Sequence, residues 1–283
     1  MKLKNKVVVV TGGSRGIGKS IAEACKKEGA LVAICARSAN ELAIAKADLE
    51  KINTVPCLAL VCDVTSHESQ QKFFADVEKE LGPIYGMICA AGVYGAIGSF
   101  IDTSFKEWEK AIDINLKGTA LSIHAAYPHL DLKSNPRIIL FSGGGQGPLV
   151  NFSAYATSKG GIWRLTETLG AELATKGVYL NSIAPGAVNT KLLDELLAAG
   201  PDKVGKDFYE KSIAQKEQGG TSPAKSAELV LYYLSEESKG LYGKTLSAVW
   251  DPYKDFKDLD KMSKSEIYQV RRVVDFDGNT KPK

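Results

Sequence analysis

Residues with side chains suited to proton transfer stand at Tyr155 and Lys159. They are four residues apart, so a helix through this segment would place the phenol and the ammonium on one face, with Cβ atoms about 6 Å apart. A neighbouring cation favours the phenolate, and the sequence therefore predicts a Tyr155 pKa below its usual value of about 10. Such a tyrosine could donate or accept a proton near neutral pH. The alternative is a solvated i,i+4 contact on a surface helix, which chance often produces.

A serine stands 13 positions before Tyr155, at the end of an apolar run. The run Ile138–Phe141 predicts a buried parallel strand that ends at Ser142. Because open α/β sheets bind ligands outside the carboxyl ends of their strands, we expect the Ser142 hydroxyl at a ligand site.

A glycine-rich segment, Thr11 to Gly18, follows a run of four valines and precedes a helical pattern that reaches Glu28. In a strand–turn–helix unit of this kind, Gly12 permits the tight turn and Gly16 lets the backbone approach a pyrophosphate, while Gly18 lets the helix pack closely on the strand. The N–H groups at the start of the helix then attract phosphate. A flexible loop is the alternative, but the order of strand, turn and helix favours a nucleotide site.

The residues after the second predicted strand, 31–36, bear on which dinucleotide is bound. Units that bind NAD usually carry an acid here for the ribose hydroxyls, whereas this chain has Ala36 followed by Arg37 and Ser38. An arginine can hold the 2′-phosphate of NADP through charge-assisted contacts, and Arg15 supplies a second cation. We therefore predict NADP(H) in preference to NAD(H); the alternative is that both arginines are ordinary surface charges.

Strand-like and helical runs alternate along the chain, the pattern of a parallel sheet with helices on both faces. Strands are predicted near residues 6–11, 31–36, 57–62, 84–89, 136–142, 178–183 and 244–249. Thr65 with Glu68 has capping-box spacing, and Ser222 before Pro223 suits a cap and a first turn, so helices are predicted to begin there. With 283 residues, 44% of them hydrophobic, we expect one doubly wound α/β domain of about seven strands.

Together these motifs resemble the short-chain dehydrogenase/reductase family in its compact single-domain form, from about residue 4 to about residue 250. The family's glycine pattern matches Thr11 to Gly18, and its serine, tyrosine and lysine match Ser142, Tyr155 and Lys159. Its remaining motifs match Asp63 with Val64 after the third strand, Asn115 within Ile112–Leu116, and Pro185-Gly186 after the sixth strand, followed by Val188 and Thr190. The resemblance implies a Rossmann-type fold.

The resemblance also implies a reversible hydride transfer between a nicotinamide and a carbonyl or secondary alcohol, and we favour reduction as the direction. Tyr155 is then expected to move the proton, Ser142 to hydrogen-bond the substrate oxygen, and Lys159 to bind the nicotinamide ribose. Asn115 is expected to hold a water that relays protons to Lys159. The residues expected to bind the cofactor are Gly12, Ser14, Arg15, Gly16, Ile17, Gly18, Arg37, Ser38, Asp63, Val64, Ala91, Gly92, Tyr155, Lys159, Pro185, Gly186, Val188 and Thr190.

The chain departs from the family pattern at three places. Cys89-Ala90-Ala91-Gly92 replaces a motif with an asparagine that braces the central sheet, which puts cofactor affinity in doubt. Gly143-Gly144-Gly145 follows the serine where bulkier residues are usual, which predicts room for a large substrate or a flexible loop. The usual end motif is replaced by Val249–Tyr253, and some thirty further residues follow.

The family domain is expected to span residues 1–250, with substrate selectivity in a loop at about 190–220. Leu192 and Leu196 at helical spacing predict a short amphipathic lid there, or a surface helix packed on the core. Residues 251–283 are expected to form an extension. The aromatics of the tail that starts at Trp250 (Trp250, Tyr253, Phe256, Tyr268 and Phe276) predict docking onto the pocket rim or a neighbouring subunit. The segment 247–252 resembles members associated with bacterial sugar and surface-polysaccharide pathways, so a sugar or another polar carbonyl is the expected substrate.

Composition argues against several other classes of protein. A net charge of +3 without a basic stripe predicts no nucleic-acid partner, and the three histidines form no metal-ligand pattern. The five cysteines include no Cys-x-x-Cys pair, which is typical of a reduced compartment, and we expect the cytoplasm. Residues 81–101 carry no charge but contain five glycines and Pro83, so no membrane span is expected.

Two further expectations concern assembly and an alternative function. The resemblance implies homodimers or homotetramers that pair through the helix carrying Tyr155 and the next long helix. The alternative function is a non-catalytic NADP-binding sensor or interaction protein. Such relatives usually lose the tyrosine or the lysine, and this chain retains both.

Overall fold

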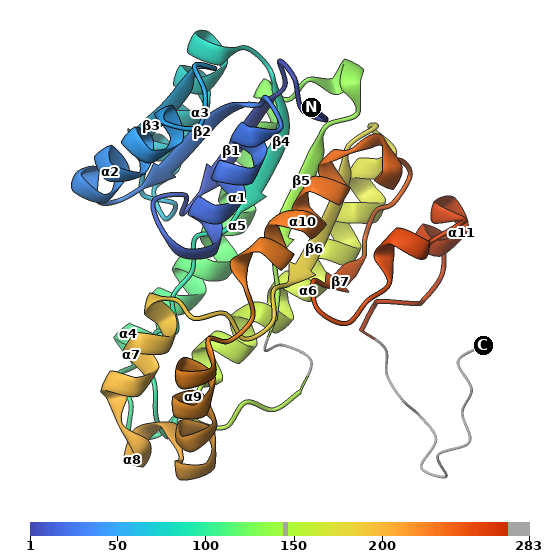
Figure 1. Ribbon diagram of the computed structural model, residues 1–283. Coiled ribbons are helices and arrows are strands. Elements are labelled where there is room, and N and C mark those ends of the chain that lie inside the picture. The colour runs from blue at the N-terminus through green and yellow to red at the C-terminus, as the bar shows by residue number, and fades with distance from the viewer. Residues whose placement is uncertain (144–146, 271–283) are drawn as a thin grey trace.

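The computed structural model describes residues 1–143 and 147–270. Within these ranges, seven parallel strands form one sheet in the order β3-β2-β1-β4-β5-β6-β7 (Figure 1). The strands are β1 (Val7–Thr11), β2 (Leu31–Ala36), β3 (Cys57–Val61), β4 (Ile84–Cys89), β5 (Arg137–Phe141), β6 (Tyr179–Ala184) and β7 (Thr245–Ser247). The chain winds outward from β1 in both directions, so the predicted doubly wound Rossmann-type sheet is confirmed.

Helices cover both faces of this sheet (Figure 1). The α-helices of the described residues are α1 (Gly16–Lys27), α2 (Ala39–Glu50), α3 (His67–Leu81), α4 (Phe105–Ile112), α5 (Gly118–Ala126), α6 (Ser153–Ala174), α7 (Lys191–Ala199), α8 (Pro201–Val204), α9 (Lys206–Gln218), α10 (Pro223–Leu234) and α11 (Leu259–Lys264). Five residues of π-helix, Asp113–Lys117, join α4 to α5.

The four valines of β1 show why an uninterrupted apolar run belongs at the centre of such a sheet. Val8 and Val10 pack on the face that carries α1, α2 and α10. Val7 and Val9 pack on the opposite face against α3, α5 and α6. Successive side chains of a strand point to opposite faces, so a strand buried on both sides must be apolar at every position.

Of the two helix starts predicted from the sequence, one is confirmed and the other lies one residue too early. Ser222 caps α10 as predicted, and its hydroxyl accepts a hydrogen bond from the Ala224 amide. The prediction of Thr65 as the cap of α3 is wrong. Ser66 is the cap, because the Thr65 hydroxyl donates instead to the Asp63 carboxylate at 2.8 Å.

The segment after β7 lies along the outer edge of that strand. The Thr245 amide of β7 donates to the carbonyl of Tyr268 at 3.3 Å. The Lys244 ammonium donates to the carbonyls of Ser265 and Ile267 at 2.6 and 3.0 Å. These bonds occupy backbone groups at the sheet edge and attach residues 251–270 to the domain. Phe276, which was expected to help dock this segment, lies outside the described residues, as do Gly144 and Gly145.

The predicted substrate loop contains three helices, α7 to α9, which extend below the carboxyl edge of the sheet in the view of Figure 1. Leu196 of α7 is buried in a separate small core with Phe152 and Val204. Leu192 is only partly buried and faces the large cavity described below. The helix therefore packs on the domain through one side and presents another side to the cavity.

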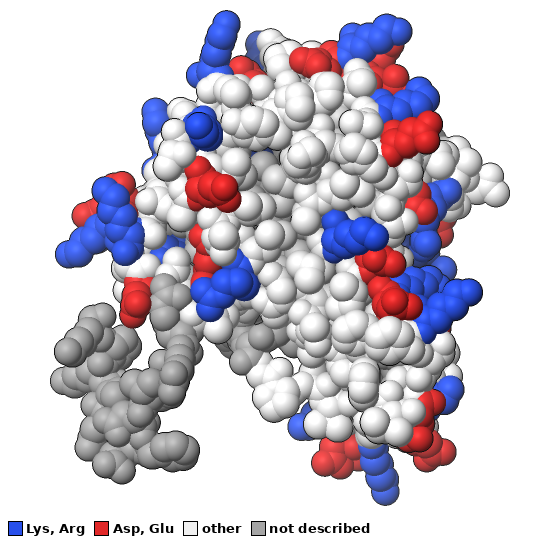
Figure 2. Space-filling model, turned by 180° about the vertical axis from the view of Figure 1, so that it is seen from behind, with Lys and Arg blue, Asp and Glu red and all other residues white. Residues whose placement is uncertain are grey.

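Charged side chains of both signs share the face of the molecule that Figure 2 draws. Figure 2 shows lysine and arginine side chains interspersed with acidic ones over the face seen from behind. Among the described residues, no helix has both the length and the apolar composition that crossing a membrane requires.

Candidate active site

A cavity of about 900 Å³ lies at the carboxyl ends of β1 to β6 and runs from the glycine-rich turn to the start of α6. The catalytic candidate Ser142 and most of the residues expected at the cofactor line its wall; the latter are Gly12, Ser14, Arg15, Gly16, Ile17, Gly18, Arg37, Ser38, Asp63, Val64, Ala91, Gly92, Tyr155, Lys159, Pro185 and Thr190. Gly186 lies elsewhere, in the wall of a second cavity, and Val188 is buried and lines neither cavity. Asn115 is buried behind the wall.

The glycine-rich turn has the shape expected of a phosphate-binding loop. Gly12 has φ of +66°, and a Cβ there would come within 2.8 Å of the Ala91 backbone. A Cβ on Gly18 would come within 2.4 Å of the Gly12 carbonyl oxygen, so α1 packs against the turn only because Gly18 has no side chain. Gly16, at φ of +56°, begins α1 and leaves its amide end open toward the cavity. These features fit a dinucleotide, whose pyrophosphate binds at a helix N-terminus.

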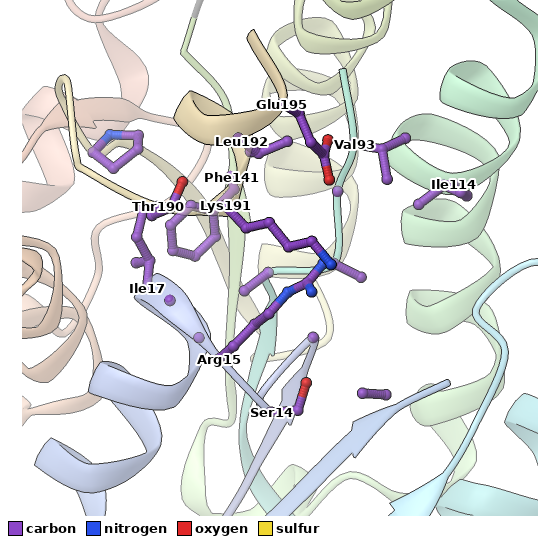
Figure 3. Close-up of a pocket in the computed structure, with 18 of the residues that line it drawn as sticks. Ser14, Arg15, Ile17, Val93, Ile114, Phe141, Thr190, Lys191, Leu192 and Glu195 are labelled. Atoms are coloured by element: carbon purple, nitrogen blue, oxygen red, sulfur yellow. The ribbon is translucent and has the colours of Figure 1, made fainter. Parts of the chain in front are cut away.

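Long charged side chains extend into the same cavity. Figure 3 shows Arg15 and Lys191 reaching into it from opposite walls, with Glu195 of α7 above them. Cations beside a helix N-terminus suit a ligand that carries several phosphate charges. Lys191 and Glu195 were not identified singly from the sequence, which marked only their loop.

Glu41 is a site residue that the sequence analysis missed. Its carboxylate accepts hydrogen bonds from the Arg15 guanidinium at 3.0 Å and from the Ser14 hydroxyl at 3.2 Å. An acid therefore stands among the arginines expected to hold a 2′-phosphate. The signal was present, because Ser38 caps α2 and Glu41 follows it at capping-box spacing.

Ser142, Tyr155 and Lys159 meet at the inner end of the cavity, where β5 ends and α6 begins. The Lys159 ammonium donates to the carbonyl of Phe141 at 2.8 Å, and it lies 5.5 Å from the centre of the Tyr155 ring. The Tyr94 ring packs edge-on against Tyr155, with centroids 4.8 Å apart. This packing fixes the Tyr155 ring in the wall of the cavity that Ser142 and Lys159 also line.

The predicted fall in the Tyr155 pKa is wrong for the unliganded chain. Burial raises the pKa of Tyr155 above its ordinary value, and the neighbouring Tyr94 adds to the effect. Burial lowers the pKa of Lys159 to about 8. The reason is that the ammonium turns toward the Phe141 carbonyl, so removal from water outweighs the attraction that the i,i+4 spacing suggested.

Asn115 connects three parts of the site from within the π-helical turn, and its side chain is 1% exposed. Its amide donates to the Val93 carbonyl and to the Ser158 hydroxyl, both at 2.9 Å, and its oxygen accepts from the Val93 amide at 2.9 Å. Both N–H donors are thus used within the protein. Asn115 therefore braces the loop after β4. The sequence Cys89–Gly92, which lacks the family's usual asparagine, was expected to weaken the bracing of the sheet in this region.

Asp63 lies just after β3, and its carboxylate is held by hydrogen bonds within its own loop. Asp63 accepts hydrogen bonds from the amide and the hydroxyl of Thr65, at 2.9 and 2.8 Å. Asp63 and Val64 form the cavity wall on the side of β3, well along the sheet from Tyr155.

Comparisons with known proteins agree with this geometry. Residues 6–199 match the family model described as short chain dehydrogenase. The chain is 31% identical over 256 residues to glucose 1-dehydrogenase 2 of Bacillus subtilis, covering 86% of this chain and 93% of that protein. It is 30% identical over 214 residues to the human mitochondrial dehydrogenase/reductase SDR family member 2, covering 76% of this chain and 75% of that protein. A crystal structure of NAD⁺-bound xylitol dehydrogenase superposes with a TM-score of 0.79 at 27% identity, over 87% of this chain and 98% of the other.

Proposed function

The chain belongs to the short-chain dehydrogenase/reductase family, whose members are oxidoreductases, and we propose that it interconverts a carbonyl and a secondary alcohol with NADP(H) as cofactor. The observation that carries the proposal is the meeting of Ser142, Tyr155 and Lys159 at the inner end of a cavity that begins at a phosphate-binding turn. A nucleotide lying along that cavity would have its reactive end beside the phenol.

The roles of the side chains follow from their positions. When bound, the nicotinamide supplies or accepts the hydride. Tyr155 gives the proton to the substrate oxygen in reduction, and Ser142 donates a hydrogen bond to that oxygen as its charge develops. Burial raises the pKa of Tyr155, so the phenol carries the proton that this step delivers. We propose reduction as the working direction.

Lys159 and Asn115 support the tyrosine. Lys159 holds the nicotinamide ribose and places a positive charge near the phenol. Asn115 keeps the loop at Gly92 in place, where a Cβ would lie 3.4 Å from the Asn115 oxygen and 3.9 Å from the Lys159 ammonium. Asn115 therefore acts as a positioning residue at the rear of the site, and water that supplies protons would reach Lys159 past it.

The choice of NADP(H) rests on the cations at the far end of the cavity. Arg37 directly follows β2 and lines the wall beside Ser38. Arg15, which is paired with Glu41, lines the same cavity. Two guanidinium groups suit a 2′-phosphate, and the pairing with Glu41 sets how strongly NADP(H) is favoured over NAD(H).

We propose a sugar, a polyol or another polar carbonyl compound as the substrate class. Two relatives that cover most of the chain carry the names glucose 1-dehydrogenase and xylitol dehydrogenase, which supports this class. We also propose a single domain over residues 1–250, a homodimer or homotetramer, and a cytoplasmic location. All five cysteines are buried free thiols, which supports a reducing compartment.

The test is NADPH oxidation against a panel of carbonyl compounds that includes keto-sugars, run with Tyr155→Phe and with Tyr127→Phe as the matched control. Tyr127 lies outside both cavities, so its variant should keep wild-type turnover. Tyr155→Phe should bind NADPH normally and lose about a hundredfold or more in kcat, the usual contribution of a general acid. Near-normal turnover in Tyr155→Phe would refute the assignment. NADPH binding without turnover on any compound would favour a nucleotide-binding sensor.

A further inference from the structure

A second cavity, of about 730 Å³, opens on the other side of the catalytic side chains. Ser142, Tyr155 and Pro185 line this cavity and the first one alike. The two spaces therefore meet where the chemistry is proposed to occur. A nucleotide occupying the first would leave the second open to the molecule that reacts with it.

The outer wall of this second cavity comes from the segment after β7. Trp250, Asp251 and Tyr268 contribute to it. Asp251 accepts a hydrogen bond from the Ser247 amide at 2.6 Å, and the Tyr268 carbonyl accepts one from the Thr245 amide at 3.3 Å. The wall is thus attached to β7 at two points.

The chemistry of the lining is aromatic and acidic. The Trp250 side chain is 83% exposed, an unusual position for a large apolar ring unless something covers it. Asp251 offers a carboxylate with one oxygen engaged by the Ser247 amide. Trp163, two turns of α6 beyond Tyr155, completes the inner wall; its ring is 5% exposed and its indole N–H has no acceptor among the residues that the structure describes. A buried donor of this kind is rare in proteins.

We propose that this second cavity is the substrate compartment, and that Asp251, Trp250 and Trp163 select a neutral polyhydroxylated substrate, a sugar or a polyol. The inference rests on the proposed function and specifies where its substrate binds. Hydroxyl groups of the ligand donate to the Asp251 carboxylate, and the Trp163 ring limits the depth of the cavity. The apolar C–H face of the ligand packs on the Trp250 ring. The Asp251 charge disfavours anionic sugars.

Three variants test the compartment without touching the proton-transfer residues: Asp251→Asn, Trp250→Ala and Trp163→Phe. Phe105→Ala is the control, because Phe105 is 58% exposed and lies outside both cavities. Steady-state kinetics are measured with the sugar or polyol that the wild type turns over best. Asp251→Asn and Trp250→Ala should raise the substrate KM about tenfold, the loss expected for one hydrogen bond to a charged group or one ring contact. The cofactor KM and kcat should stay within twofold.

A direct binding measurement separates this inference from the proposed function. Xylitol and D-glucose are titrated calorimetrically, with NADP⁺ present, into Tyr155→Phe and into each variant combined with Tyr155→Phe, so that turnover adds no heat. D-Glucuronate, the anionic counterpart of glucose, should gain affinity relative to glucose in Asp251→Asn, a result that a purely structural role of Asp251 would not produce.

The kinetic and binding results together distinguish the substrate compartment from the proposed function. Wild-type turnover with an unchanged substrate KM in all three variants would overturn the compartment and leave the proposed function standing. Sugar binding that weakens in the variants, in a protein without turnover, would support the compartment while the proposed function fails. Absence of both turnover and binding with neutral sugars and polyols would overturn the substrate class.

Discussion

Lys159 is predicted to destabilise the unliganded protein, so Lys159→Met should raise its stability at neutral pH while removing its activity. Burial lowers the pKa of this lysine from 10.5 to about 8. Each pKa unit corresponds to 1.36 kcal/mol, so holding the charged form in the folded chain costs about 3 kcal/mol. Methionine keeps the packing of the stem but removes the donor to the Phe141 carbonyl, which costs about 1–2 kcal/mol. The net gain at pH 7 should be about 1–2 kcal/mol.

The sign of the pH dependence follows from the direction of the shift. Below pH 8 the lysine is protonated in both the folded and the unfolded chain, and the full cost is present. Between pH 8 and 10.5 the unfolded chain binds more protons than the folded chain, so stability rises with pH through this window as the cost disappears. The advantage of Lys159→Met over the wild type should therefore shrink by pH 10.

The assay is urea unfolding of the cofactor-free wild type and variant at pH 7 and pH 10. Lys79→Met serves as the control, since the Lys79 side chain is 79% exposed and its variant should match the wild type within about 0.5 kcal/mol at both pH values. The reasoning is refuted if Lys159→Met is less stable than the wild type at pH 7. It is also refuted if the stability difference between them is the same at pH 10.

Three other substitutions give separate checks. Gly18→Ala should lower the midpoint of urea unfolding, because the new Cβ would lie 2.4 Å from the Gly12 carbonyl oxygen. Gly147→Ala is the control, since nothing lies within 4 Å of its new carbon, and it should leave the midpoint unchanged. Equal midpoints for the two variants would contradict this prediction. Arg37→Ala should weaken NADPH binding about tenfold in a calorimetric titration and change NADH binding little, since a charge-assisted contact is lost; equal effects would remove the basis for NADP(H). Glu41→Gln should strengthen NADPH binding relative to NADH binding, because the substitution removes a negative charge from the end of the cavity where the 2′-phosphate is proposed to bind. An unchanged ratio of the two affinities would show that Glu41 does not affect cofactor selectivity.

The sheet could be predicted closely because each strand carries its own signal. A run such as Val7–Val10 is apolar at every position, and only a strand covered on both faces needs that pattern. The last strand was the least accurate: residues 244–249 were predicted, but β7 spans Thr245–Ser247, because pairing with β6 extends over those three residues alone.

The features of the candidate site also differ in how far local sequence determines them. Residues fixed by local spacing, such as the glycines of the turn and the Tyr155–Lys159 pair, were found at the cavity as expected. The direction of the Tyr155 pKa shift was not, because it depends on burial by residues distant in sequence such as Tyr94. Contacts between distant segments leave little local pattern, so the sequence predicted that residues 251–283 dock on the pocket rim or a neighbouring subunit but did not single out Asp251 in the wall of the second cavity.

Tracing the hydride itself tests the central claim most directly. NADPH carrying deuterium at both C4 positions of the nicotinamide is incubated with the preferred carbonyl substrate, and the alcohol product is analysed by mass spectrometry. Our account predicts that one deuterium appears on the former carbonyl carbon in the wild type, and that the labelled product is nearly absent with Tyr155→Phe. Product formed without the label, or labelled product formed at the wild-type rate by Tyr155→Phe, would contradict it.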